Sequence, residues 1–267
     1  MPRPRPPIAN ATSSFRSTLP MSTFPSMPDV SLGRIPGGSA ALSGYLARPD
    51  GDGPFPGVVA VHEAFGLDDV LRRQCDRLAA AGYLTLGPDL FSDGGVKKCV
   101  VGTFRAMATG HGKAFADIEA ARQHLLADPA CTGKVGIIGF CMGGGFALVT
   151  STRGFDVAAA NYGAVPLKAQ QALRGACPIV ASYGGADPLM PAMAGRLEKA
   201  LTTLGVPHDV KKYPGAGHSF LNDAPNGPER LRPLLKIMNI GPNPAAAADA
   251  WRRIETFFAE HLTDAAS

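Results

Sequence analysis

Three features of the amino-acid sequence predict an α/β protein with a mostly parallel central sheet and helices on both faces. Short runs of β-branched and other apolar residues alternate with longer segments whose apolar residues recur at helical spacing. Such alternation builds a parallel sheet, because each helix carries the chain back before the next strand starts. The short runs, such as 58–61 and 179–181, are continuously apolar, which is typical of strands buried on both faces.

The predicted elements follow one another with short connections along most of the chain. Strands are expected at residues 42–47, 56–61, 83–86, 134–138, 157–162, 178–183 and 208–213. Helices are expected over about 67–81, 113–127 and 190–204, after the glycines at 143–145, and in a terminal segment marked by Trp251, Ile254, Phe258 and Leu262. Residues 91–112 contain five glycines and predict no regular element.

The composition indicates one soluble domain preceded by an extension. A chain of 267 residues that is 45% hydrophobic is large enough to bury a sizeable core. We expect a single domain over residues 28–267 and a disordered segment over 1–27, which is rich in Pro and Ser and lacks apolar periodicity. This segment has three arginines and no acid, so a targeting peptide stays open, as does a true start at Met21 or Met27.

Charge and cysteine usage exclude several classes of protein. Residues 1–28 carry +3 of the formal net charge of +4, which leaves +1 for the rest and predicts no nucleic-acid-binding face. Five cysteines without Cys-x-x-Cys spacing predict neither a disulfide framework nor a zinc site. No apolar run approaches the roughly 18–20 residues of a membrane-spanning helix, so we expect no membrane partner and a cytoplasmic location.

The strand expected at 134–138 leads into Gly139-Phe140-Cys141-Met142-Gly143, followed by an apolar helix start. Gly-x-Cys-x-Gly between a strand and a helix is typical of the nucleophile elbow of α/β-hydrolases, with cysteine in place of serine. The turn is so tight that flanking glycines keep the strand and the helix apart. A buried cysteine beside a flexible glycine run is the alternative, but the strand before and the apolar run after favour the elbow.

Three other polar residues also follow expected strands: Glu63, Asp187 and His218. The carboxyl ends of parallel strands lie at one edge of a sheet, where ligands bind, so residues distant in sequence meet there. The order nucleophile, acid, histidine along the chain is that of the α/β-hydrolase triad. The remaining histidines lack such a setting and are expected to be surface or packing residues: His62, His111, His124, His208 and His261.

Each residue type suits one step of acyl transfer. Cys141 attacks as a thiolate, which a helix N-terminus and an imidazolium stabilise. His218 exchanges the proton with Cys141, while Asp187 orients the ring and stabilises its charged form. We expect the backbone N–H groups of Ala64 and Met142 to bind the oxyanion.

These motifs together resemble the dienelactone hydrolase (carboxymethylenebutenolidase) family over residues 30 to 262. The resemblance rests on the cysteine elbow, His62-Glu63-Ala64-Phe65-Gly66, the Gly-Gly-x-Asp-Pro that contains Asp187, and Gly-His-Ser-Phe around His218. It implies a single α/β-hydrolase domain, typically monomeric, with a Cys141–His218–Asp187 triad and no cofactor or metal. It also implies that Glu63 binds the resting thiol and takes its proton when substrate arrives. The family reaction opens a lactone in the breakdown of chlorinated aromatic compounds.

One departure from the family pattern concerns the substrate. The best-known members carry an arginine four residues after the catalytic histidine, where it grips the substrate carboxylate, and here that position is Asn222. Arg105 is a candidate for a replacement grip. Further expected substrate contacts are Phe65, Tyr162, Phe220 and Asn222 itself. The long segment 223–244 includes an apolar stretch that suits a lid over the site.

The sequence therefore favours a hydrolase of a small ester or lactone of the dienelactone type. A broader carboxylesterase or thioesterase is the alternative within the hydrolases. A non-catalytic hydrolase fold that serves as a binding protein is a third interpretation, but such a scaffold is expected to have lost one of the four polar positions, and all four are present.

Overall fold

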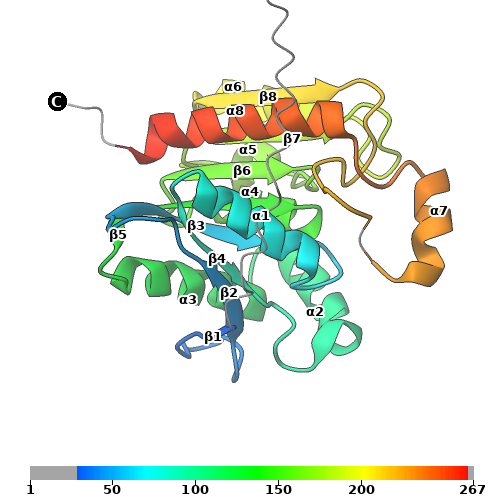
Figure 1. Cartoon of the computed structure of the whole chain (residues 1–267). Helices are drawn as coiled ribbons and strands as arrows, with labels where there is room; N and C mark the ends of the chain where they lie inside the picture. The colour runs from blue at the N-terminus through cyan, green and yellow to red at the C-terminus, as the bar shows by residue number, and fades with distance from the viewer. Residues whose placement is uncertain (1–28, 226, 264–267) are drawn as a thin grey trace, which may run out of the picture.

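The computed structural model describes residues 29–225 and 227–263, which contain an eight-stranded sheet (Figure 1). The strands are β1 (Val30–Ser31), β2 (Ser43–Ala47), β3 (Phe55–Val61), β4 (Leu84–Pro88), β5 (Cys131–Phe140), β6 (Val157–Asn161), β7 (Ile179–Gly184) and β8 (His208–Tyr213). Their order across the sheet is β1-β2-β4-β3-β5-β6-β7-β8. Strands β1 and β2 are antiparallel to their neighbours, whereas β4, β3 and β5 to β8 run parallel. The predicted mostly parallel sheet is confirmed, and the extension expected at 1–27 lies outside the described residues.

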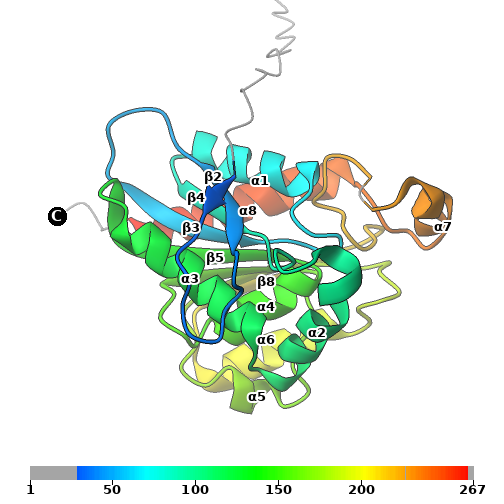
Figure 2. The same ribbon diagram turned by 90° about the horizontal axis from the view of Figure 1, so that it is seen from below.

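Helices lie against both faces of this sheet (Figure 2). On one face are α1 (Asp69–Ala80) and α8 (Pro244–Leu262). On the other are α2 (Gly95–Thr109), α3 (Lys113–Ala127), α4 (Met142–Thr150), α5 (Ala169–Ala172) and α6 (Met193–Leu204). A short 3-10 turn, η1 (Glu229–Leu231), and α7 (Arg232–Ile237) belong to neither layer. None of the helices in the described ranges is both long and apolar enough to span a membrane.

The central strands show why the apolar runs are continuous. In β3, Val59 and Val61 belong to the core cluster that includes α3 and α4, whereas Val58 and Ala60 belong to the cluster that includes α1 and α8. All four side chains have 0% exposure. Successive side chains of a strand point to opposite faces, so a strand covered on both faces needs apolar residues at every position.

The structure contains a helix in the segment 91–112, the part of the sequence from which no element could be predicted. Residues 95–109 form α2, which begins after Gly94 and ends at Gly110, both with positive φ. Only Thr103 and Ala106 of this helix are buried, so its apolar pattern is weak and the glycines dominate the sequence signal.

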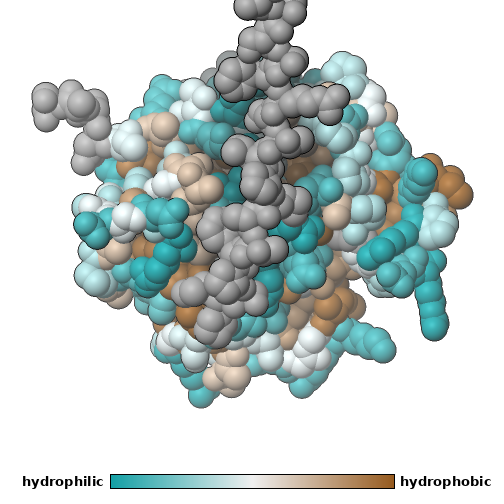
Figure 3. All heavy atoms as spheres, in the orientation of Figure 1, coloured by the Kyte–Doolittle hydropathy of each residue, from teal (hydrophilic) through white to brown (hydrophobic). Residues whose placement is uncertain are grey.

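The segment 223–244, expected as a lid, carries η1 and α7 away from the body of the fold (Figure 1). Its end returns to the sheet edge: His218 N donates to Asn239 O at 3.0 Å, and Gly241 N donates to His218 O at 2.8 Å. Leu231, Leu234 and Ile237 are exposed on it, and Figure 3 shows apolar surface at this edge of the molecule.

Candidate active site

Cys141 occupies a strained turn between β5 and α4. Its φ is +53° and its ψ is −112°, a conformation that costs a side-chain-bearing residue about 1–3 kcal/mol. Two hydrogen bonds hold it: Cys141 N donates to Asn161 O at 3.1 Å, and Gly145 N donates to Cys141 O at 3.2 Å. Its side chain is half-buried at the N-terminus of α4. The tight turn predicted from Gly-x-Cys-x-Gly is therefore present.

The glycines beside Cys141 allow backbone to pack directly on backbone. A β-carbon on Gly139 would lie 1.9 Å from Gly143 O, and one on Gly143 would lie 2.1 Å from Val61 O. A β-carbon on Gly144 would lie 2.6 Å from Asn161 O. The first turn of α4 thus fits between β3, β5 and β6 only without side chains at these positions.

His218 and Asp187 form a buried pair at the same edge. His218 Nδ1 donates to Asp187 Oδ2 at 2.7 Å, and the two side chains are 3% and 0% exposed. Asp187 Oδ1 accepts a second hydrogen bond, from Leu189 N at 2.8 Å, which fixes the carboxylate. His218 Nε2 has no hydrogen-bond partner among the described residues. The ring therefore presents this second nitrogen for proton transfer.

Three effects act on the pKa of His218. Burial lowers the pKa, but the hydrogen bond with Asp187 and the neighbouring Cys141 outweigh burial and raise the pKa from 6.5 to about 10. Cys141 is therefore close enough to the ring to affect its charge, although the thiol makes no well-aligned hydrogen bond to Nε2.

Glu63 lies in the turn after β3 and is only 8% exposed. Its Oε2 accepts a hydrogen bond from Ser219 Oγ at 3.1 Å, and its Oε1 accepts one from Asn222 Nδ2 at 3.4 Å. Burial and then the Glu63 carboxylate raise the pKa of the Tyr162 hydroxyl well above its ordinary value. Glu63 is thus a buried carboxylate held by neutral donors close to Cys141 and His218.

Three of the expected substrate contacts are buried. Asn222 is 3% exposed, and its Oδ1 accepts hydrogen bonds from Gln74 Nε2 at 3.1 Å and Tyr162 OH at 3.4 Å. Tyr162 and Phe220 are both 0% exposed, and the ring of Tyr162 lies 5.0 Å from that of His218 and 5.7 Å from that of Phe220. These side chains contact Glu63 and His218 directly or through one another, and their role as substrate contacts stays a prediction.

The other two expected contacts remain accessible. Phe65 is half-buried, and its ring packs against Gly227 at the start of the segment that carries α7. Arg105 is exposed on α2, and its side chain makes no hydrogen bond or ion pair within the ranges that the structure describes. Nothing in its contacts connects Arg105 with Glu63, Cys141 or His218.

Backbone strain marks the same region, at the expected residues Cys141 and Tyr162 and at Ser219, which the sequence did not single out. Among the described residues other than glycine, five have positive φ, and three of these are Cys141, Tyr162 and Ser219. Strained backbone concentrates at functional sites because only a rigid surrounding structure maintains it. Tyr162 directly follows β6, as the other site residues follow their strands, and that position was the available signal. Ser219 is adjacent to His218.

The backbone N–H groups expected to bind an oxyanion lie on the two turns that meet at Cys141. Met142 is the first residue of α4, and the first N–H groups of a helix have no partner within the helix. Ala64 follows Glu63 after β3.

No group of three or more potential metal ligands among His, Cys, Asp and Glu occurs within residues 29–225 and 227–263.

A strained turn after β5 and an acid–histidine pair after β7 and β8, on a mostly parallel eight-stranded sheet, define an α/β-hydrolase fold. The model of the dienelactone hydrolase family matches residues 42–262, and the chain belongs to this family. It is accordingly a hydrolase of carboxylic esters.

Individual relatives agree with this membership. The chain is 28% identical over 250 residues to a carboxymethylenebutenolidase-type protein of Synechocystis sp., with 85% of this chain and 95% of that protein covered. It is 28% identical over 240 residues to the carboxymethylenebutenolidase of Rhodococcus opacus, with 82% of this chain and 86% of that protein covered. A solved dienelactone hydrolase-like promiscuous phosphotriesterase from metagenomic libraries has a TM-score of 0.72 at 24% identity, with 88% and 98% covered, and shows the same fold.

Proposed function

We propose that this protein hydrolyses small esters or lactones through Cys141 as nucleophile, His218 as acid and base, and Asp187 as the group that orients His218. The single observation that carries the proposal is the buried His218–Asp187 pair, which leaves Nε2 available beside a cysteine held at a strained elbow. Family membership supports the same assignment.

The residues suggest the following sequence of steps. The Cys141 thiolate attacks the ester carbonyl, and the N–H groups of Ala64 and Met142 bind the oxyanion that forms. As the carbon–oxygen bond to the leaving group breaks, protonated His218 gives its Nε2 proton to the departing alkoxide. Neutral His218 then removes a proton from water, which attacks the thioester, and the acid leaves as Cys141 returns to the thiolate. For a lactone, the alkoxide and the acid are two ends of one product.

Glu63 has a separate task in this proposal. The family resemblance assigns it the proton of the resting thiol. The support for that task is the buried position of its carboxylate in the turn after β3, where Ser219 and Asn222 donate hydrogen bonds to it.

The environment of residue 222 favours an uncharged substrate. Asn222 replaces the arginine of the best-known family members, and its side chain is already engaged by Gln74, Tyr162 and Glu63. Arg73, which directly precedes Gln74 on α1, is paired with Asp223. We therefore propose that simple neutral esters and lactones are better substrates than a dienelactone that carries a carboxylate. A broader esterase or thioesterase activity fits the same observation.

A panel of substrates tests the proposal: cis- and trans-dienelactone, p-nitrophenyl acetate and butyrate, and an acyl thioester. Cys141→Ala is expected to abolish turnover of every substrate at unchanged melting temperature. Cys131→Ala is the matched control, because Cys131 lies at the opposite end of the same strand. Full activity of Cys141→Ala would exclude the proposed nucleophile, and no hydrolysis of any substrate by wild type would favour a binding protein. The monomeric state, the cytoplasmic location and a role in aromatic degradation stay predictions.

A further inference from the structure

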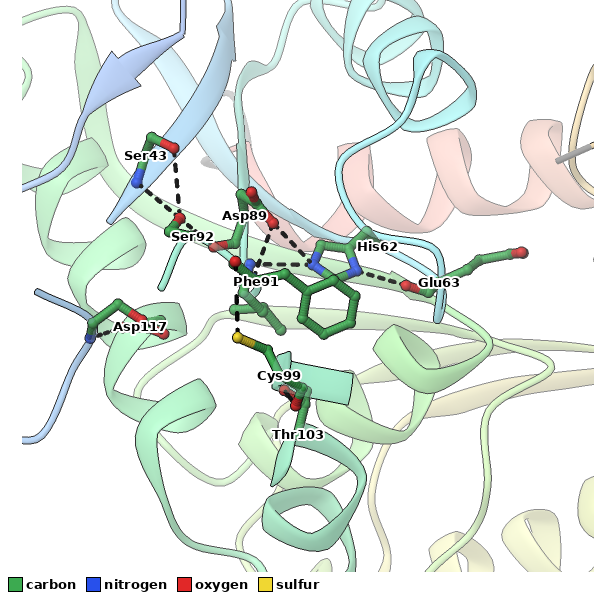
Figure 4. Close-up of polar contacts among 11 residues, drawn as sticks. Ser43, His62, Glu63, Asp89, Phe91, Ser92, Cys99, Thr103 and Asp117 are labelled. Atoms are coloured by element: carbon green, nitrogen blue, oxygen red, sulfur yellow. Dashed lines mark hydrogen bonds and ion pairs between the residues drawn. The ribbon is translucent and has the colours of Figure 1, made fainter. Parts of the chain in front are cut away.

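His62, directly before Glu63, is fully buried and has both ring nitrogens engaged (Figure 4). Leu90 N donates to His62 Nε2 at 3.1 Å, and His62 Nδ1 lies 2.6 Å from the carbonyl oxygen of Glu63. A backbone N–H can only donate, so Nε2 has to be the accepting nitrogen. The ring hydrogen is therefore on Nδ1, and Nδ1 donates to Glu63 O.

The surroundings of His62 keep this neutral form in place. Burial lowers the pKa of the ring below its usual value. The ring of Phe91 lies across it at 4.7 Å between centroids, and Asp89 Oδ1 is 3.9 Å from Nε2. Asp89 Oδ1 also accepts a hydrogen bond from Phe91 N at 2.9 Å, which fixes the turn that brings Leu90 N to the histidine. The ring is thus held on three sides.

The carbonyl that His62 contacts belongs to the peptide unit between Glu63 and Ala64. Gly66 N donates to the same oxygen at 3.3 Å, so two donors fix the direction of this carbonyl. A trans peptide is planar, and its C=O and N–H point in opposite directions. The orientation of Glu63 O therefore sets the orientation of Ala64 N–H. Figure 4 shows the Glu63 side chain extending away from the histidine while its carbonyl faces the ring.

The end of β3 also packs against Gly143, the residue after the second expected oxyanion donor, Met142. A β-carbon on Gly143 would lie 2.1 Å from Val61 O and 2.9 Å from His62 O, so the backbone of α4 rests on the residues next to His62. Gly143 directly follows Met142. A fixed peptide at 63–64 is therefore fixed relative to Met142 N–H as well.

We propose that His62 is a positioning residue that directs the Ala64 N–H toward the oxyanion of the reaction. This inference rests on the proposed function, because it requires a tetrahedral oxyanion at Cys141. His62 acts through the Glu63–Ala64 peptide and touches no reacting atom. Its effect is confined to the steps in which the carbonyl oxygen carries negative charge.

Two substitutions test the hydrogen bonds of Nδ1 and Nε2 of His62 one at a time. In His62→Asn the amide nitrogen lies near the position of Nδ1 and keeps a donor for Glu63 O. In His62→Gln the amide oxygen lies near the position of Nε2 and keeps an acceptor for Leu90 N, but the donor to Glu63 O is lost. Removal of an oxyanion donor typically costs about 10²–10³-fold in rate, so a misdirected donor is expected to lower kcat of His62→Gln about 10–100-fold. We expect KM to stay within about twofold and kcat of His62→Asn to stay within about threefold of wild type.

Alkylation of Cys141 by iodoacetamide provides the readout that distinguishes this role from a general structural one. Alkylation needs the thiolate but forms no oxyanion, so both variants are expected to be alkylated at the wild-type rate. Equal kcat losses in the two variants, or alkylation that slows in step with turnover, would overturn the proposal. So would wild-type kcat in His62→Gln.

A measurement on the unmutated enzyme covers the case in which the variants fail to fold. Nitrogen-15 NMR of histidine-labelled protein at neutral pH is expected to show His62 as the neutral tautomer with hydrogen on Nδ1. Hydrogen on Nε2, or a charged ring, would overturn the inference. Activity in a Cys141→Ala variant would instead contradict the proposed function, in which Cys141 is the nucleophile, whatever the protonation state of His62.

Discussion

Gly139 offers a direct test of the packing at the elbow. In Gly139→Ala the new β-carbon would lie 1.9 Å from Gly143 O, 2.2 Å from Gly143 C and 2.7 Å from Gly144 N. All three are backbone atoms, so no side chain can rotate away. Real β-carbons essentially never approach closer than 3.0 Å, so the first turn of α4 has to move by about 1.1 Å, the difference between 1.9 and 3.0 Å.

The consequence of this shift is expected in both stability and activity. Overpacking typically costs about 1–3 kcal/mol, occasionally more, and a contact with rigid backbone places Gly139→Ala at the upper end or beyond. For a domain of this size each kcal/mol lowers the melting temperature by about 2–4 °C. A displacement of about 1 Å at the nucleophile is expected to lower kcat/KM about 10²-fold.

Thermal melts followed by circular dichroism and ester hydrolysis by the same samples measure the two effects. Gly102→Ala is the matched control, because Gly102 is exposed on α2 and a β-carbon there meets nothing within 4 Å. Alanine at that helical site is expected to stabilise by up to about 1 kcal/mol and to leave kcat/KM unchanged. A Gly139→Ala enzyme with wild-type melting temperature and kcat/KM would refute the close packing of α4 on β5.

Two further predictions concern charge at the site. Glu63→Gln keeps the shape of the buried side chain and removes its charge, so we expect kcat/KM to fall at least about tenfold with little change in stability. The control is Glu260→Gln, at an exposed position, for which we expect the wild-type kcat/KM and melting temperature. A pH profile of Glu63→Gln that coincides with wild type at every pH would remove Glu63 from the mechanism. The raised pKa of His218, about 10 against an ordinary 6.5, means that its pairing with Asp187 stabilises the fold fully below pH about 6.5 and is lost as pH rises toward 10. The excess of the wild-type melting temperature over that of Asp187→Asn is therefore expected to shrink across this range, and a constant or growing excess would contradict the assignment.

The sequence predicts the positions of the site residues because chain topology determines them. Cys141, Asp187 and His218 each follow an apolar run, and the carboxyl ends of parallel strands share one edge whatever the details of packing. In the structure the two residues meet at this edge, and His218 Nδ1 lies 2.7 Å from Asp187 Oδ2. The boundaries of the seven expected strands agree with the structure within three residues, because the buried apolar runs are continuous. The two-residue strand β1 was not expected.

The partners of those residues were not predictable, because side-chain packing selects them. Glu63 is held by Ser219 and Asn222, which are more than 150 positions away in the sequence. Asn222 stands where the best-known family members carry a substrate-binding arginine, and its Oδ1 accepts hydrogen bonds from both Gln74 and Tyr162. Sequence position alone gave no reason to expect either contact.

The burial of His62 was predictable from the sequence, but its hydrogen bonds were not. A lone histidine next to a strand is usually a packing residue, and its complete burial confirms that expectation. Its two hydrogen bonds, to Glu63 O and from Leu90 N, depend on the turn after β4. No spacing in the sequence encodes that turn, and the helix α2 that follows it was not predicted either.

The central claim is that Cys141 forms a covalent acyl intermediate. Rapid acid quench during turnover of p-nitrophenyl acetate, followed by peptide mass spectrometry, measures it directly. An added acetyl group is expected on the peptide that contains Cys141 in wild type, and on no peptide of Cys141→Ala. An acetyl group on any other cysteine in step with turnover, or full turnover without acylation of Cys141, would contradict the claim.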